Sequence, residues 1–335
     1  CPELLQALNV QGWVQPTAVQ CQALPPALAG MDVQVCAPTG TGKTLSFLLP
    51  LLQGWLATPG TLPVALAAPS ALVLVPTREL AEQVSQVARV LASSLTPAPV
   101  IQLVLGGEPL EGQVAALASG CDLLIATPGR LLELLRQQAL TLAQVRQLVL
   151  DEADRLLEMG FRRELDQLLE LLVARQQTLL FSATFPDAVT GLAQALLRTP
   201  QRITVESRPQ GAIDEQGYWV NKGSKAALLL HLLQQRAGET ALVFVNQRAT
   251  ADSLVKRLCK QGVAAAALHG DKSQAERSGV LARLQAGALP VLVATDLAAR
   301  GLDISALPLV LNFELPDAPA TYVHRIGRTG RAGRS

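Results

Sequence analysis

The residues whose chemistry is plainest lie in Ala37–Thr44, APTGTGKT, which follows a short apolar run. Glycines let backbone N–H groups wrap a chain of phosphates, and the start of a following helix adds a favourable dipole. In this pattern Lys43 reaches the β- and γ-phosphates, and the hydroxyl of Thr44 ligates Mg²⁺. The segment predicts a nucleotide site, although Ala37 replaces the first glycine of the general pattern. The predicted contacts are Thr39, Gly40, Thr41, Gly42, Lys43 and Thr44.

A second chemical segment is Asp151–Asp154, DEAD, which directly follows the apolar run Gln147–Leu150. A carboxylate at the carboxyl end of a strand can hold a Mg²⁺ shell, so Asp151 is expected to share the metal with Thr44. Glu152 beside it is positioned to orient and deprotonate an attacking water. The alternative is a solvated acidic turn, but the position after a buried strand favours the second half of a nucleotide site.

Short apolar runs that alternate with helix-period segments must position these residues. Continuous apolar strands separated by helices are typical of a parallel sheet covered on both faces. Helices are expected at Arg78–Leu91 and Glu164–Val173, among others. The expected strands are Val33–Ala37, Ala71–Val75, Val100–Leu105, Leu123–Ala126, Leu148–Leu150, Thr178–Phe181, Ile203–Val205, Ala241–Val245, Ala264–Leu268, Val291–Ala294 and Leu309–Phe313.

The chain divides into two halves of similar rhythm. Glu206–Ile213, ESRPQGAI, has linker character, so we expect two domains, 1–207 and 208–335. Residues 1–207 carry 12 Lys/Arg against 17 Asp/Glu, for a net charge of −5, and residues 208–335 carry 16 against 10, for +6. This asymmetry fits a second half that meets phosphates.

Composition sets the class of protein. The 335 residues are 49% hydrophobic and 16% charged, with mean hydropathy +0.29, which excludes a mainly disordered chain. The apolar runs are of strand length, far short of the ~20 residues of a membrane span. The five cysteines form no C-x-x-C pair, which argues against zinc and predicts buried, reduced thiols in a reducing compartment. The chain begins at Cys1, so we expect it to be a fragment.

With further motifs the sequence resembles a DEAD-box ATP-dependent RNA helicase over nearly its whole length. Ala37–Thr44 matches motif I of that family and Asp151–Asp154 matches motif II. The other matching segments, in family order, are Gly12-Trp13 with Pro16-Thr17 and Gln20 (Q motif), Pro76–Leu80 (Ia), Gly106-Gly107 (glycine doublet), Thr127–Arg130 (Ib), Ser182–Thr184 (III), Val243–Asn246 (IV), Gln274 with Arg277, Thr295–Asp303 (V) and His324–Arg331 (VI).

The resemblance implies two RecA-like α/β domains with ATP and Mg²⁺ bound in a cleft between them. Gln20 would read the adenine edge and Asp303 would meet the ribose. Arg328 and Arg331 would act as arginine fingers on the γ-phosphate. Ser182, Thr184 and His324 would couple motifs II and VI. With no His/Cys cluster nearby, His269 and His324 are expected to form hydrogen bonds between motifs rather than to bind metal.

The resemblance also implies an RNA partner, gripped by its sugar-phosphate backbone. Such contacts carry little sequence information. The residues implied are Arg78, Gly107, Thr127 and Arg130 from the first half, with Arg277 and Thr295 from the second. The family continues past motif VI with another strand and helix, so the second domain is expected to be truncated at Ser335.

The predicted function is therefore an RNA-stimulated ATPase that unwinds or remodels RNA. One alternative is an ATP-dependent RNA clamp with little unwinding, which shares every motif. Another is a DNA helicase, against which the Q motif, Asp154 and His324 argue. We expect a monomer whose protein partners act through flanking tails, with no membrane contact. The nucleus or cytoplasm is the favoured location, with an organelle left open.

Overall fold

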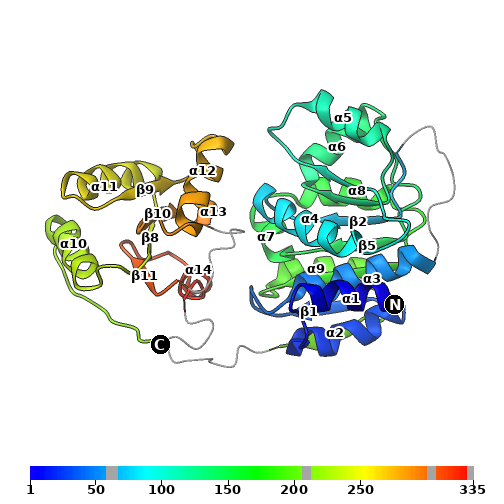
Figure 1. Cartoon of the computed structure of the whole chain (residues 1–335), viewed down its shortest axis with the longest axis horizontal. Helices are drawn as coiled ribbons and strands as arrows, with labels where there is room; N and C mark the ends of the chain where they lie inside the picture. Colours follow the sequence, from blue (N-terminus) through cyan, green and yellow to red (C-terminus); the bar gives the residue numbers. More distant parts are fainter. Residues whose placement is uncertain (58–66, 206–212, 300–306, 330–335) are drawn as a thin grey trace. The chain divides into compact units, whose positions relative to one another are not determined.

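The computed structural model describes residues 1–57, 67–205, 213–299 and 307–329. The chain divides into two compact units, Cys1–Ser207 and Arg208–Ser335. Each unit is a parallel sheet with helices packed on it (Figure 1). No helix in the described ranges combines the length and apolarity that crossing a membrane requires.

The first unit alternates strands and helices along its length. Its strands are β1 Val33–Cys36, β2 Ala71–Leu74, β3 Ile101–Val104, β4 Leu123–Ala126, β5 Gln147–Leu150, β6 Gln177–Ser182 and β7 Gln201–Thr204. Its helices are α1 Pro2–Val10, α2 Ala18–Leu28, α3 Lys43–Ala57, α4 Arg78–Ala92, α5 Leu110–Ala118, α6 Pro128–Arg136, α7 Ala153–Glu158, α8 Arg162–Glu170 and α9 Asp187–Leu196.

These seven strands form one sheet in the order β3-β4-β2-β5-β6-β1-β7, and every pairing is parallel. Alternate residues of a strand face opposite sides of the sheet. Along β2, Ala71 and Val73 enter a core with α1–α4, whereas Leu72 and Leu74 enter a second core with α6–α9. All strands end at the same sheet edge, so the loops that follow them are brought together there.

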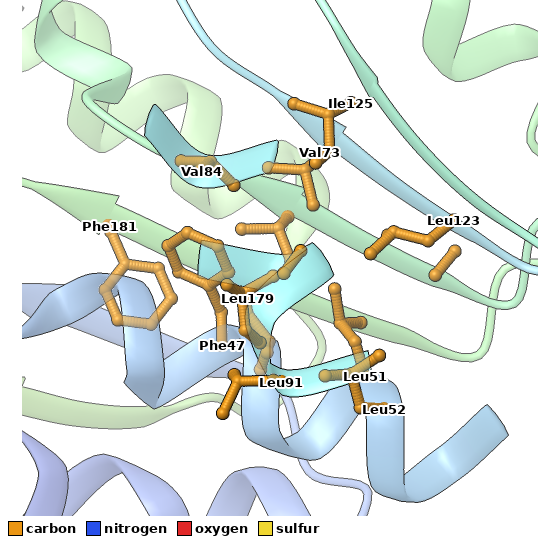
Figure 2. Close-up of a cluster of buried hydrophobic side chains, with 14 of the residues drawn as sticks. Phe47, Leu51, Leu52, Val73, Val84, Leu91, Leu123, Ile125, Leu179 and Phe181 are labelled. Carbon is orange, nitrogen blue, oxygen red and sulfur yellow. The ribbon is translucent and has the colours of Figure 1, made fainter. Parts of the chain in front are cut away.

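The first of these cores fixes the helix that follows the glycine-rich loop. Phe47 of α3 lies beside Phe181 of β6, and Leu51 and Leu179 belong to the same core (Figure 2). The rings of Phe47 and Phe181 meet edge to face, with centroids 5.4 Å apart. Because Phe47 is fully buried four residues after Lys43, this packing sets the position of the amino end of α3.

The second unit repeats the pattern on a smaller scale. Its elements are the 3₁₀ turn Lys222–Ser224, α10 Lys225–Gln235, β8 Ala241–Val245, α11 Arg248–Lys260, β9 Ala265–Leu268, α12 Gln274–Gln285, β10 Val291–Thr295, α13 Asp296–Ala299, β11 Leu309–Asn312 and α14 Pro319–Ile326. The sheet order is β11-β8-β10-β9, again parallel throughout. Ala241, Val243 and Val245 pack with α10 and α11, and Leu242 and Phe244 pack on the opposite face.

The predicted fold class, two tandem α/β domains with mostly parallel sheets, is confirmed. All eleven predicted strands are present within one or two residues. The predicted helix Glu164–Val173 begins earlier, at Arg162, and ends at Glu170.

The prediction that the cysteines are buried is wrong for most of them. All five thiols are free, but only Cys121 is buried, whereas Cys21 and Cys259 are exposed on helices. Burial raises the pKa of the Cys121 thiol to about 12. A cysteine in a helix can face either side, and its residue type alone does not decide which.

Candidate active site and nucleic-acid interface

The glycine-rich loop connects β1 to α3, as the sequence predicts. Gly40 and Gly42 have φ of +76° and +90°, values that residues with a side chain rarely adopt. The buried Lys43 ammonium donates to the carbonyl of Ala37 at 2.9 Å, and the Thr41 hydroxyl donates to the carbonyl of Pro38 at 2.8 Å. The loop therefore folds back on itself around the lysine.

Gln20 connects this loop to the helix that precedes β1. Thr17 and Gln20 form a capping box at the start of α2, in which the Thr17 N–H donates to Gln20 Oε1 at 2.9 Å. The Nε2 of the same amide donates to the carbonyl of Gly42 at 3.1 Å. A Cβ on residue 42 would lie 2.6 Å from that nitrogen. One lone pair and one N–H of the Gln20 amide are left for another partner.

The acidic segment lies at the end of β5, as predicted. Glu152 has a left-handed backbone, φ +50° and ψ +53°, which is uncommon for a residue with a side chain and clusters at functional sites. Asp151 is buried and accepts the backbone N–H of Glu152 at 2.9 Å. Burial raises the pKa of Asp151 to about 6, opposed by the charge of Lys43 and reinforced by Glu152 and Asp154.

The donor set suits Mg²⁺. A hard cation prefers oxygen ligands, and the Asp151 carboxylate with the Thr44 hydroxyl supplies two of them beside a phosphate loop. Asp151 is buried beside the carboxylates of Glu152 and Asp154, and a divalent cation would offset this concentration of negative charge. Among the described residues no cluster of three His, Cys, Asp or Glu forms a complete protein cage.

The sequence predicts no specific role for Asp154, but the structure places its side chain at the centre of a hydrogen-bond network. Its Oδ2 accepts both the N–H and the hydroxyl of Thr184 at 2.9 Å, and its own N–H donates to the Ser182 hydroxyl at 3.1 Å. Ser182 Oγ in turn donates to the Thr184 carbonyl at 2.7 Å. Motifs II and III are thus bonded directly, and the coupling of motif II to motif VI through Ser182 and Thr184 stays a prediction.

The predicted RNA residues of the first unit gather along the same sheet edge, after the neighbouring strands β2, β3 and β4. The Arg78 guanidinium lies against Gly107, so closely that a Cβ there would overlap it. Gly106 N–H donates to Thr127 Oγ1 at 3.4 Å, and Arg130 Nη1 donates to the carbonyl of Glu108 at 2.8 Å. Within the described ranges, Arg78 forms no ion pair.

In the second unit, Thr295 ends β10 and is buried, and Arg277 lies in the first turn of α12. The buried Arg328 follows α14, and its carbonyl accepts the N–H of Leu307 at 3.1 Å. His269 Nε2 is bonded to Asp252 of α11, which lies outside the motifs named above, so this bond does not join two motifs. Asp303 and Arg331 lie outside the described residues, as does the side chain of His324.

The sequence reading also missed Arg325, which is 2% exposed. Its guanidinium donates to both oxygens of Asp296 at 2.6 Å, to Asn246 Oδ1 at 2.8 Å, to Asn312 Oδ1 at 3.0 Å and to the Glu314 carbonyl at 2.5 Å. It also lies 5.0 Å from the centre of the Phe244 ring. Arg325 therefore joins motifs IV, V and VI.

Two parallel α/β units, a phosphate loop after β1 and an acidic segment after β5 of the same sheet define a P-loop nucleotide-binding protein. Family models add the particular family. The family model described as DEAD/DEAH box helicase matches residues 17–192, and the model described as helicase conserved C-terminal domain matches residues 224–333. The chain belongs to the DEAD-box helicase family.

Individual relatives agree with this. The chain is 42% identical over its whole length to ATP-dependent RNA helicase DbpA of Escherichia coli, and the match covers 72% of DbpA. The probable ATP-dependent RNA helicase DDX4 of Pelophylax lessonae is 39% identical, and the chain spans 47% of its length. Among solved structures, Dbp5 of S. cerevisiae bound to RNA and ADP BeF3 matches with a TM-score of 0.83 at 31% identity, covering 100% of this chain and 85% of that one.

Proposed function

We propose that the chain is an RNA-stimulated ATPase that uses ATP hydrolysis to unwind or remodel RNA. The main support is that the candidate nucleotide-binding residues and the candidate RNA-binding residues follow different strands at the same edge of one sheet. Lys43, Asp151 and Asp154 lie after β1 and β5, and Arg78 and the other RNA candidates lie after β2, β3 and β4. Since β2 and β5 are adjacent strands, a nucleotide site and a backbone-gripping site adjoin within one unit.

For ATP, the Gln20 amide keeps an acceptor and a donor, which matches the N6 amine and N7 of adenine. Its bonds to Thr17 and Gly42 fix its orientation, so reading the base also sets the phosphate loop. Lys43 neutralises phosphate charge, and Glu152 accepts the proton of the attacking water. Mg²⁺ held by Thr44 and Asp151 would neutralise the charge on the β- and γ-phosphate oxygens.

The second domain would supply the remaining charge. Arg328 and Arg331 provide planar guanidinium groups that stabilise the γ-phosphate during transfer, and Asp303 binds the ribose. In our proposal Arg325 is the positioning residue for this segment, because it holds α14 to the ends of β8, β10 and β11. Arginine fingers are worth roughly 10³–10⁵ in rate, so hydrolysis needs both domains.

For RNA, the first unit offers Arg78, Gly107, Thr127 and Arg130, and the second Arg277 and Thr295. Charged and hydroxyl groups with an exposed glycine backbone suit phosphate and sugar contacts, which carry little sequence preference. Names of relatives that include ATP-dependent RNA helicase favour RNA over DNA as the partner. We propose a monomer in a reducing compartment, where the exposed Cys21 and Cys259 thiols stay reduced.

The direct test is steady-state ATPase activity with single-stranded RNA and with DNA of the same sequence, each compared with no nucleic acid. We expect stimulation by RNA only, with ATP preferred over GTP, and no activity in Lys43→Ala. Equal stimulation by both nucleic acids, or equal turnover of GTP, would contradict the proposal. Strand displacement measured beside RNA retention separates an unwinding enzyme from a clamp.

A further inference from the structure

The two units place an arginine at equivalent positions. In each sheet three strands repeat the same spatial order, β3-β4-β2 in the first unit and β9-β10-β8 in the second. Arg78 is the first residue of the helix after β2, and Arg248 is the first residue of the helix after β8. The central strand of each trio ends at a threonine proposed to contact RNA, Thr127 after β4 and Thr295 in β10.

The match extends to what each arginine covers. Arg78 lies against Gly107, which follows the outer strand β3, and Arg248 lies beside Gly270, which follows the outer strand β9. A Cβ on residue 270 would be 3.4 Å from Arg248 Nη2. Arg248 is therefore the counterpart of Arg78 in the second unit.

The two arginines differ in one respect. Arg248 Nη1 is paired with Asp271 Oδ1 at 2.5 Å, whereas Arg78 forms no ion pair with any residue that the structure describes. Asp271 follows Gly270 directly, as Glu108 follows Gly107, but among the described residues only Asp271 forms an ion pair with the arginine of its unit. A carboxylate and a phosphate bind the guanidinium fork in the same manner.

We propose that Asp271 competes with an RNA phosphate for Arg248, so that RNA binding by the second unit requires this ion pair to open. The inference rests on the proposed function, since it assumes that RNA reaches this edge of the second sheet. It deepens that function by assigning Asp271 as an internal competitor that lowers RNA affinity.

The pair is built to open without disturbing its surroundings. Its side chains are 55% and 62% exposed, so water readily solvates both charges and the pair stabilises the fold little. The loop is held by other bonds. Asp252 of α11 accepts from His269 Nε2 and from Lys272 Nζ, both at 3.1 Å. Ser273 with Glu276 then caps α12, so the loop keeps its position when Asp271 is released.

The test is fluorescence anisotropy of a labelled oligouridine strand with the full chain, Mg²⁺ and a non-hydrolysable ATP analogue, over a range of salt. Arg248→Ala should weaken binding roughly tenfold, the scale of a charge-assisted hydrogen bond. It should also reduce the slope of log K against log salt by about 0.7, for one lost phosphate contact. Asp271→Asn should tighten binding about two- to fivefold, and should do nothing in an Arg248→Ala background.

Arg236 and Glu239 provide the matched control, because they form an ion pair just after α10 whose side chains are 48% and 39% exposed. Arg236→Ala and Glu239→Gln change the net charge identically and should leave affinity within twofold of wild type. The proposal is overturned if Arg248→Ala weakens binding no more than Arg236→Ala. It is also overturned if Asp271→Asn leaves affinity unchanged, or raises it equally with and without Arg248.

Arg78→Ala separates this inference from the proposed function. If Arg78→Ala weakens binding and Arg248→Ala does not, only the competition fails. If the wild-type chain binds no RNA, the proposed function fails, and the competition with it.

Discussion

Asp154 Oδ2 accepts both the N–H and the hydroxyl of Thr184, each at 2.9 Å. Thr184→Val keeps the backbone donor and the side-chain shape but removes the hydroxyl donor. A charge-assisted hydrogen bond is worth roughly 1.5–3 kcal/mol, so the acidic segment should be held less firmly. We expect RNA-stimulated kcat to fall severalfold with little change in ATP affinity. The control is Thr190→Val, because the Thr190 hydroxyl bonds the Phe185 carbonyl just before α9. Equal losses of kcat in the two variants would contradict the role of the Thr184 hydroxyl.

Gly107→Ala should displace Arg78, because the new methyl group would overlap the guanidinium and φ at this position is +78°. We expect RNA affinity to fall roughly tenfold, as for loss of one charge-assisted contact. The left-handed backbone adds a cost of about 1 kcal/mol to the first unit. Gly112→Ala on α5, where nothing lies within 4 Å of the added atom, should change neither quantity. Unchanged RNA affinity in Gly107→Ala would show that Arg78 does not need this position.

Asp151→Asn should stabilise the protein in the absence of nucleotide and metal. The pKa of Asp151 is about 6 when folded, above the reference of 3.8, so the folded state binds more protons between these values. The free energy of unfolding therefore falls as pH rises through this window and stays lower above pH 6. The gain on substitution should approach about 3 kcal/mol at pH 8 and vanish near pH 4.

Thermal melting in EDTA at both pH values checks the Asp151 prediction. Asp166→Asn, in the exposed pair with Arg162, serves as the control and should shift neither melt appreciably. A lower melting temperature for Asp151→Asn at pH 8 would show that the ionised carboxylate stabilises the fold.

Local patterns predict most of this fold, because the central strands β2, β4, β8 and β10 are short apolar runs that are buried on both faces. Lys43, Asp151 and Glu152 are equally readable, since phosphate and water chemistry restricts them to few residue types. The contacts of Gln20 with Gly42 and of Asp154 with Thr184 cannot be predicted from local patterns. The partners lie 22 and 30 residues apart, and the folded sheet brings them together. Arg325 was missed for the same reason, as its acceptors come from the ends of three strands.

Arg325→Lys should destabilise the second unit. A lysine retains the charge but offers a compact ammonium in place of a planar fork, so it cannot meet Asp296, Asn246 and Asn312 together. Breaking a buried charged network typically costs about 3–5 kcal/mol, and the conservative change should cost about half of that. Arg283→Lys on α12 is the control. Chemical denaturation of both variants measures the difference; equal midpoints would contradict a joining role for Arg325.

The central claim is that Glu152 deprotonates the attacking water in a cycle that couples ATP to RNA. Glu152→Gln keeps the side-chain size and a hydrogen-bond acceptor but cannot take up the proton. The decisive measurement is the dissociation rate of labelled single-stranded RNA from wild type and Glu152→Gln, each with Mg²⁺ and ATP. We predict that the variant binds ATP normally, hydrolyses almost none and retains RNA far longer than wild type. Release of RNA at the wild-type rate, with hydrolysis intact, would contradict the account.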